Sequence, residues 1–373
     1  MKLLNYVKID NTSVTNFDGE KLYVATGDVD ENEIISGEKV TFENRPSRAN
    51  VVAIKGQILF ARMQNTKKVL FIDEYKAKNI YSTGFCTLSV SENILGKYIY
   101  YYLNSYKFNL LKDKECTGAT QKAINNKGIE KIEIKEIPNI EKQKKIIEEF
   151  DILKDALINR QEQIKDIDNM IKSVFIKMFG NPIKNDMQWE FKKLGDICDI
   201  YRGASPRPIE KYLKGTIPWI KIGDATTGDN IYLNQTKEYV TEEGAQKSRL
   251  IKKGGLIFAN CGVSLGFARI INFDGCIHDG WLAFENYQKY LNPIFFLKSL
   301  NFCTEYFRKI APDGTQPNLN TNIMNNYIQI IPPIEKQNLY SNICEIFDKQ
   351  KELLEKEIND IVILIKNKEE QYF

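Results

Sequence analysis

The chain has 373 residues, of which 43% are apolar and 27% are charged, and its formal net charge is +3. That apolar fraction can fill real cores, so the composition excludes a disordered chain, and no uncharged apolar run reaches the ~18 residues of a membrane span. Charged residues follow Met1 too early for a signal peptide, and seven cysteines without a C-x-x-C pair predict free thiols in a reducing cytoplasm.

Residues 1–138 are expected to form a first globular part. Short β-rich runs occur at Leu22–Ala25, Val51–Ile54, Gln57–Phe60 and Val69–Ile72, and glycines punctuate them. An aromatic-rich helix is expected from Tyr98 to Leu111, with a core face formed by Tyr98, Tyr101, Tyr102 and Phe108. This mixture predicts an α+β domain with a mostly antiparallel or mixed sheet.

A long helix is predicted from Ile140 to Gly180. Its apolar residues recur in steps of three and four, at Ile146, Phe150, Leu153, Leu157, Ile164, Ile167, Ile171, Val174 and Met178. This spacing is typical of a coiled-coil seam, interrupted once by Arg160. Since an apolar seam does not stay exposed, the helix needs a partner.

The partner is a second copy of the same pattern in the chain. The sequence Ile140-Glu141-Lys142-Gln143 returns as Ile334-Glu335-Lys336-Gln337, and a second apolar seam follows over 335–373. Further matches recur in order about 195 residues apart, so the chain is an internal duplication. We expect two α/β domains separated by two long helices that pair as an antiparallel coiled coil. The expected ranges are 1–138 for the first domain, 139–188 for the central helix and linker, 189–332 for the second domain and 333–373 for the C-terminal helix.

Catalytic motifs are not found in the sequence. There is no phosphate-binding G-x-x-x-x-G-K-[ST] loop and no glycine-rich dinucleotide loop, and the fragments around Pro182 and Pro332 are incomplete versions of a methyltransferase signature. His278 is the single histidine; a zinc site with Cys261 and Cys276 has poor ligand spacing, and a turn or strand edge is the favoured position for this residue.

Basic and amide side chains cluster in both globular parts. Arginine reads guanine, asparagine and glutamine read adenine, and lysine binds phosphate. The alternative for any single residue is a solvated surface charge. The candidate DNA-binding residues are Arg45, Arg48, Arg62, Lys67 and Lys68 in the first part, and Tyr201, Arg202, Ser205, Arg207, Lys247 and Arg249 in the second.

Several motifs together resemble the specificity subunit of type I restriction–modification systems over nearly the whole chain. They are Gly203-Ala204-Ser205-Pro206-Arg207, Ile217-Pro218-Trp219-Ile220, Leu256-Ile257-Phe258-Ala259 after Gly254, Gly314-Thr315-Gln316-Pro317-Asn318-Leu319-Asn320 and Pro332-Pro333-Ile334-Glu335-Lys336-Gln337. The resemblance implies two target recognition domains that read a bipartite site on double-stranded DNA. It also implies a non-catalytic chain that holds two methyltransferase subunits and, for restriction, motor-nuclease subunits. S-adenosylmethionine, ATP and magnesium are then expected on those partners and no cofactor on this chain.

The repeated motifs extend the candidate sites. We assign Thr120, Gln121, Lys122, Thr315, Gln316 and Asn318 to DNA binding, and Pro138, Glu141, Gln143, Pro332, Glu335 and Gln337 to partner binding. The first half departs from the family pattern because it lacks the Ser-Pro-Arg motif and the proline found at Pro317, so the halves are expected to read different sequences. Two alternatives remain open: a coiled-coil adaptor with peptide-binding domains, and a specificity half separated from a fused restriction–methylation enzyme.

Overall fold

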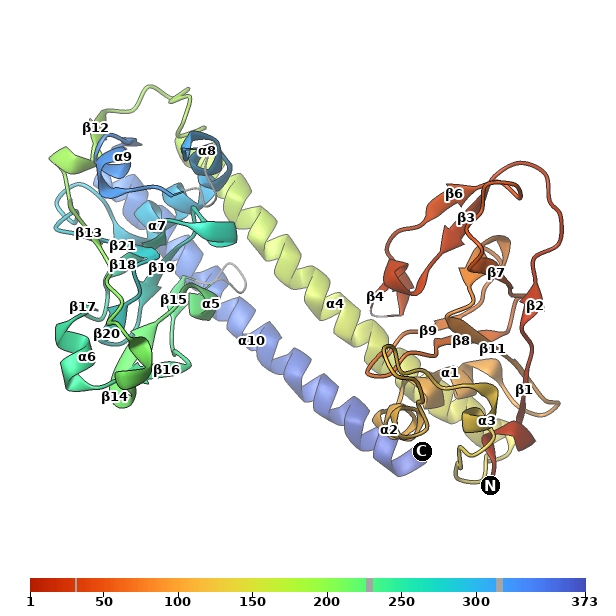
Figure 1. Cartoon of the computed structure of the whole chain (residues 1–373). Helices are drawn as coiled ribbons and strands as arrows, with labels where there is room; N and C mark the ends of the chain where they lie inside the picture. The colour runs from red at the N-terminus through yellow and green to blue at the C-terminus, as the bar shows by residue number, and fades with distance from the viewer. Residues whose placement is uncertain (31, 226–230, 313–317) are drawn as a thin grey trace. The chain divides into compact units, whose positions relative to one another are not determined.

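The computed structural model describes residues 1–373 except 31, 226–230 and 313–317. The chain divides into two compact units, residues 1–160 with 356–373 and residues 161–355 (Figure 1). Each unit therefore contains one globular part and one half of each of the two long helices. No helix among the described residues is both long and apolar enough to cross a membrane.

Unit 1 contains two main sheets. The first is antiparallel, in the order β1-β11-β8-β9 (Val7–Ile9, Phe85–Val90, Ile58–Ala61, Val69–Phe71). The second is mixed, in the order β2-β7-β10-β3-β6 (Thr12–Ser13, Ala49–Val52, Ile80–Ser82, Lys21–Val24, Glu38–Val40), with β4 and β5 (Val29–Asp30, Glu33–Ile34) as a separate pair. Its helices are α1 (Gly96–Asn104), α2 (Tyr106–Lys114) and α3 (Asn126–Ile129).

Unit 2 repeats this plan. One sheet has the order β13-β21-β18-β19-β15 (Asp199–Arg202, Trp281–Glu285, Leu256–Ala259, Ala268–Ile271, Tyr232–Leu233), and the other β16-β14-β20-β17 (Glu238–Val240, Leu213–Ile220, Gly275–Ile277, Arg249–Ile251). β12 and β22 (Phe191–Lys193, Ile328–Ile330) pair separately. The helices are α5 (Ile222–Ala225), α6 (Glu242–Gln246), α7 (Pro293–Phe302), α8 (Thr304–Ile310) and α9 (Thr321–Asn325). The predicted α+β class and the duplication are confirmed.

The four predicted strands of the first part all exist, within two residues of the expected bounds, but the aromatic helix is two helices. Ser105 has an extended backbone between α1 and α2, and its hydroxyl accepts the N–H of Phe108 as the N-cap of α2. The matching segment of unit 2 breaks at Cys303, between α7 and α8. The expected core residues Tyr98, Tyr101, Tyr102 and Phe108 are all buried.

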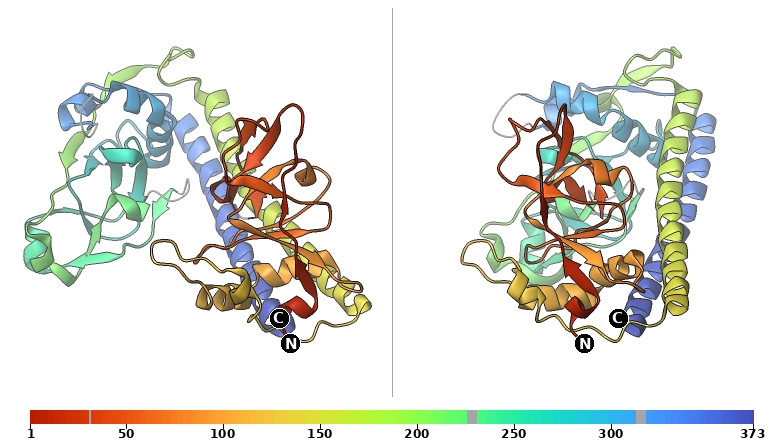
Figure 2. Two further views of the ribbon diagram at one scale, coloured as in Figure 1. Left: turned by 45° about the vertical axis from the view of Figure 1, so that its right-hand side comes forward. Right: turned by 90° about the vertical axis from the view of Figure 1, so that its right-hand side faces the viewer.

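The long helices α4 (Ile140–Phe179) and α10 (Ile334–Tyr372) pair antiparallel in both units (Figure 2). In unit 1, Lys368 donates to Glu149 at 2.8 Å. In unit 2, Lys351 donates to Asp168 at 2.7 Å. Within the predicted α4 seam, Ile146, Phe150, Ile167 and Ile171 are fully buried and the remaining members are half-buried. Phe175 and Phe179 are also buried, because α7 covers this part of α4.

A buried glutamine near the start of each long helix joins it to its own globular part. Gln143 accepts the N–H of Leu95 at 2.8 Å, and its amide donates to the carbonyls of Asn93 and Pro138. Gln337 accepts the N–H of Asn292 at 2.8 Å and donates in the same way to the carbonyls of Tyr290 and Pro332. The side chain thereby makes three hydrogen bonds inside the fold in both units.

Burial corrects part of the partner-binding prediction. Gln143 and Gln337 are both 0% exposed, and Pro332 is buried as well. These three residues have no surface to offer a partner, because the fold itself covers them. Glu141 and Glu335 are exposed and Pro138 is half-buried, so these three stay predictions.

Gln143→Ala should lower the free energy of unfolding of the isolated chain by about 1 to 3 kcal/mol, because it removes three hydrogen bonds from a buried side chain to the main chain. Glu141→Ala, an exposed change in the same turn of α4, should stay within about 0.5 kcal/mol. Denaturant unfolding of both variants measures the difference. Equal stability of the two variants would show that the glutamine does not hold the helix to the domain.

Candidate nucleic-acid interface

In each unit, one inner strand of a sheet (β8 in unit 1 and β18 in unit 2) is followed directly by a residue whose peptide group joins three loops. In unit 1, the N–H of Arg62 donates to Gly84 O and the Arg62 carbonyl accepts the N–H of Ile124, both at 2.9 Å. We call this arrangement the junction of unit 1. It brings together the loop after β8, the turn before β11 and the loop before α3.

Unit 2 contains the same junction at Asn260. Its N–H donates to Gly280 O at 3.0 Å, and its carbonyl accepts the N–H of Leu319 at 2.8 Å. The loops after β18, before β21 and before α9 therefore meet as their counterparts do in unit 1. The main-chain pattern is conserved between the halves although the residue at its centre is arginine in one and asparagine in the other.

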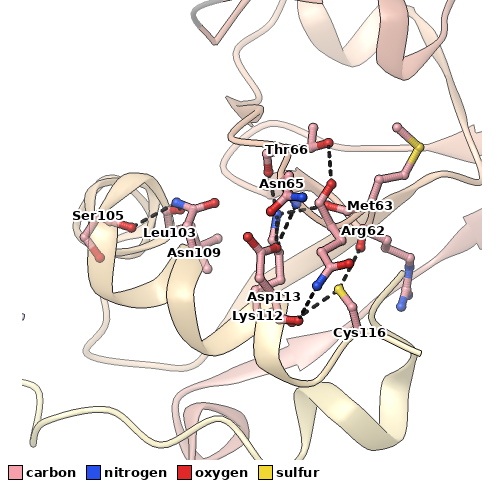
Figure 3. Close-up of polar contacts among 11 residues, drawn as sticks. Arg62, Met63, Asn65, Thr66, Leu103, Ser105, Asn109, Lys112, Asp113 and Cys116 are labelled. Carbon is pink, nitrogen blue, oxygen red and sulfur yellow. Dashed lines mark hydrogen bonds and ion pairs between the residues drawn. The ribbon is translucent and has the colours of Figure 1, made fainter. Parts of the chain in front are cut away.

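A buried lysine holds the loop after β8 in unit 1 (Figure 3). Lys112 is 1% exposed, and its ammonium donates to the carbonyls of Met63, at 3.1 Å, and Thr66. The adjacent Asp113 accepts the N–H of Asn65 at 3.1 Å. Burial lowers the pKa of Lys112, while the carboxylate of Asp113 opposes that shift.

Arg308 has the same role in unit 2. It comes from α8, which corresponds to α2, and donates to the carbonyls of Val263 at 3.1 Å and Leu265 at 3.4 Å. Each unit thus uses one cation, from α2 in unit 1 and from α8 in unit 2, to fix the loop beyond β8 or β18.

The predicted residues of unit 1 fall into two groups. In the first group, the side chains of Arg45, Arg62 and Lys68 donate hydrogen bonds to main-chain carbonyls within the unit. Some of their N–H donors are therefore already used by the fold. Arg48 and Lys67 are exposed, and no described residue forms a hydrogen bond or ion pair with either side chain. The Arg48 carbonyl accepts the N–H of Thr83, next to Gly84, which places Arg48 beside the junction.

The structure brings the predicted loop 120–122 to the same place. Thr120, Gln121 and Lys122 are exposed. The Lys122 carbonyl accepts the N–H of Gln64 at 2.9 Å, and Arg62 also donates from its guanidinium to Ile124 O. Two segments far apart in the sequence, both assigned to DNA binding, are therefore neighbours in unit 1.

Asp279 organises the predicted residues of unit 2. Its carboxylate accepts the hydroxyl of Ser205 at 2.8 Å and lies 3.7 Å from the Arg207 guanidinium, while its carbonyl accepts from Arg202 at 2.9 Å. His278 Nε2 lies 3.0 Å from the same carboxylate, and burial lowers the pKa of this histidine. Asp279 thus contacts two arginines and a hydroxyl through its carboxylate and its main-chain carbonyl.

The remaining predicted residues of unit 2 are placed as follows. Arg249 donates to Arg202 O at 3.1 Å and stacks over the Tyr201 ring at 4.5 Å, so these residues adjoin the Asp279 cluster. Lys247 is instead held by Glu243 and Tyr212. Thr315 and Gln316 lie outside the described residues.

Asn318 adjoins the loop after β18, because its backbone forms a bridge with Cys261. Its side-chain oxygen is buried and makes no hydrogen bond with a described residue. The same holds for both polar atoms of the Asn260 side chain, which is 0% exposed. Buried polar groups are normally paired, so these two asparagines mark the junction of unit 2 as unusual.

Sequence reasoning missed the supporting residues of the interface. No role in DNA binding was assigned from the sequence to Asp279, Lys112, Arg308 or Asn260. The repeat itself contains a usable signal, since Lys112 and Arg308 occupy matching positions about 195 residues apart. No group of three or more metal-ligating side chains suited to a metal ion occurs among the residues that the structure describes.

Comparison with known proteins gives the family. The model for the type I restriction modification DNA specificity domain matches residues 4–167 and 187–362. The chain belongs to this family. Two matches to one domain model also agree with the two junctions, one in each half.

Solved structures with a similar fold are those of type I systems. One was determined in work on the "complex assembly" and "conformational transition" of the type I R-M system. Its sequence is 18% identical to this chain, the TM-score is 0.62, and the match covers 100% of this chain and 98% of that chain. The S subunit from M. genitalium is 16% identical, with a TM-score of 0.58, over 100% of this chain and 95% of its own. At this identity they show the shared fold.

Asn260→Leu should raise the free energy of unfolding by about 1 kcal/mol, because it removes a buried amide that forms no side-chain hydrogen bond with a described residue and keeps the same number of side-chain heavy atoms. Asn320→Leu is the matched control: the Asn320 side chain caps α9 by accepting the N–H of Ile323 at 2.9 Å, so its loss should cost about 1 kcal/mol. Denaturant unfolding tests both. Destabilisation by Asn260→Leu would mean that the amide is hydrogen-bonded in solution.

Proposed function

We propose that this chain is the DNA specificity subunit of a type I restriction–modification complex. It recognises a bipartite target on double-stranded DNA, with target recognition domains at residues 1–138 and 189–332, and directs adenine methylation and restriction by its partners. The observation that carries the proposal is the repeated junction. One main-chain arrangement with different side chains in its two copies suits the reading of two different half-sites.

The charges at the two junctions suit duplex DNA. Arg48 and Lys67 are exposed cations whose side chains form no hydrogen bond or ion pair with a described residue, and such side chains bind phosphate. In unit 2, the main-chain carbonyl of Asp279 accepts a hydrogen bond from Arg202 and its carboxylate lies 3.7 Å from Arg207, and a guanidinium has further paired N–H donors beyond such a contact. Guanine edges accept such paired donors in the major groove.

The chemistry belongs to the partner subunits in this proposal. The chain itself is non-catalytic and holds no cofactor, S-adenosylmethionine binds to two methyltransferase subunits, and ATP and magnesium bind to motor-nuclease subunits. An exposed apolar stripe on α10 supports partner docking: Leu339, Ile346 and Leu353 recur every seven residues and are 56%, 66% and 64% exposed. Such a stripe fits the apolar face of a helix from a methyltransferase subunit.

Two other functions make different predictions. A coiled-coil adaptor with peptide-binding domains would bind duplex DNA weakly and with little dependence on salt, whereas phosphate contacts make the affinity fall steeply as salt rises. A specificity half separated from a fused restriction–methylation enzyme would differ only in its partner, which neighbouring genes identify. The basic side chains at both junctions favour the specificity subunit.

Replacing residues 1–138 with the matching part of another family member should change one half of the methylated target and leave the other half unchanged. Each unit has its own junction, so each half-site is expected to be read independently. The measurement is sequencing of the methylated sites produced by the variant together with its methyltransferase subunits. A reaction without those subunits should leave the DNA unmethylated, and a change in both halves, or in neither, would contradict the proposal.

A further inference from the structure

Val263 is the most exposed of the large apolar side chains that the structure describes. It lies in the short turn Gly262–Ser264 after β18 and is 95% exposed. Scattered apolar residues on a surface are ordinary, but the other exposed large apolar side chains that the structure describes are only 36% to 80% exposed. Here the whole side chain projects from a loop that belongs to the junction of unit 2.

The backbone holds the turn firmly in this position. Arg308 donates to the carbonyls of Val263 and Leu265, and the Leu265 N–H donates to Gly262 O at 3.1 Å. The next residue, Gly266, donates its N–H to Ala259 O at 2.9 Å and accepts the hydroxyl of Thr304 at 3.0 Å. Because both sides of the turn are bonded, Val263 is not free to fold back against the protein.

The surroundings of Val263 are polar. Arg308 lies beneath it, Ser264 follows it, and Cys261 in the same loop bridges to Asn318. The corresponding turn of unit 1 has no apolar side chain at its tip, because it consists of Gln64, Asn65 and Thr66, and Asn65 matches Val263. An exposed apolar tip is therefore a property of the second unit alone.

We propose that Val263 determines specificity by contacting the 5-methyl group of a thymine in the half-site read by unit 2. This inference rests on the proposed function. Thymine carries the one apolar group that the bases present in the major groove, and small apolar side chains contact it. A rigid, isolated valine among polar donors and acceptors fits one methyl group better than it fits an extended apolar surface.

The test uses the complex with its methyltransferase subunits and duplexes of the target found from its methylated sites. The half-site of unit 2 is the half that persists when residues 1–138 are exchanged. Each thymine in that half is replaced in turn by deoxyuridine, which lacks only the methyl group. One replacement should weaken binding about fourfold, the factor that corresponds to one methyl-sized apolar contact.

Val263→Ala should weaken binding to the thymine duplex by a similar factor and abolish the difference between thymine and deoxyuridine at that position. Ile183→Ala, at another exposed aliphatic residue of unit 2, should keep the difference. Three results would overturn the inference while leaving the proposed function intact: a half-site without thymine, no effect of any replacement, or equal discrimination by Val263→Ala. Absence of any sequence preference in the parent complex would overturn the proposed function itself, and the inference with it.

Discussion

The main-chain hydrogen bonds at Arg62 and Asn260 are the interaction on which the two candidate reading surfaces depend. Each residue directly follows an inner strand (β8 or β18), donates its N–H to the turn before the neighbouring strand and accepts an N–H from the loop before a short helix. Peptide groups provide these bonds, so the arrangement does not require a particular side chain at either position. The side chains around the junction were thus able to diverge after duplication while the loops kept their places.

The cations beneath the loops follow the same principle. Lys112 and Arg308 both donate to carbonyls of the loop beyond β8 or β18, yet one is buried and the other partly exposed. Both bind the main chain, and they leave the exposed positions of the loop free to vary. In unit 1 those positions hold Lys67 and amides; in unit 2 they hold Val263. To read two different half-sites, the two units need the same main-chain arrangement and different side chains at the exposed positions of the loop.

The interruptions of the helical seam have a physical explanation in the structure. Lys351 stands where the repeat has Leu157, and it is 3% exposed and paired with Asp168. Arg160 stands where the repeat has Leu354, and it pairs with Glu357. A polar residue in a coiled-coil seam favours the one register that gives it a partner, at some cost in stability. These two pairs therefore favour the antiparallel alignment of α4 and α10 over shifted alternatives.

The sequence alone predicts the features that depend on nearby residues and misses those that depend on contacts between residues far apart in the chain. The long helices and the buried strands follow from local periodicity, and the duplication follows from repeated motifs. The division at Ser105 was missed because a serine N-cap inside an apolar pattern resembles an ordinary helical position. The partner-binding assignment of Gln143 failed because a repeated polar residue looks like a surface motif, whereas its hydrogen bonds to Leu95 and Asn93 come from distant segments. The Asp279 cluster likewise joins residues more than seventy positions apart.

The central claim is that the loops at the two junctions form the DNA-reading surfaces. Hydrogen exchange of the chain in complex with its methyltransferase subunits, with and without the target duplex, tests it most directly. The account predicts slower amide exchange in residues 62–68 and 117–123 of unit 1 and in residues 260–266 of unit 2, with no change around the buried Gln143 and Gln337. Unchanged exchange in all three loops, with protection confined to other surfaces, would contradict it.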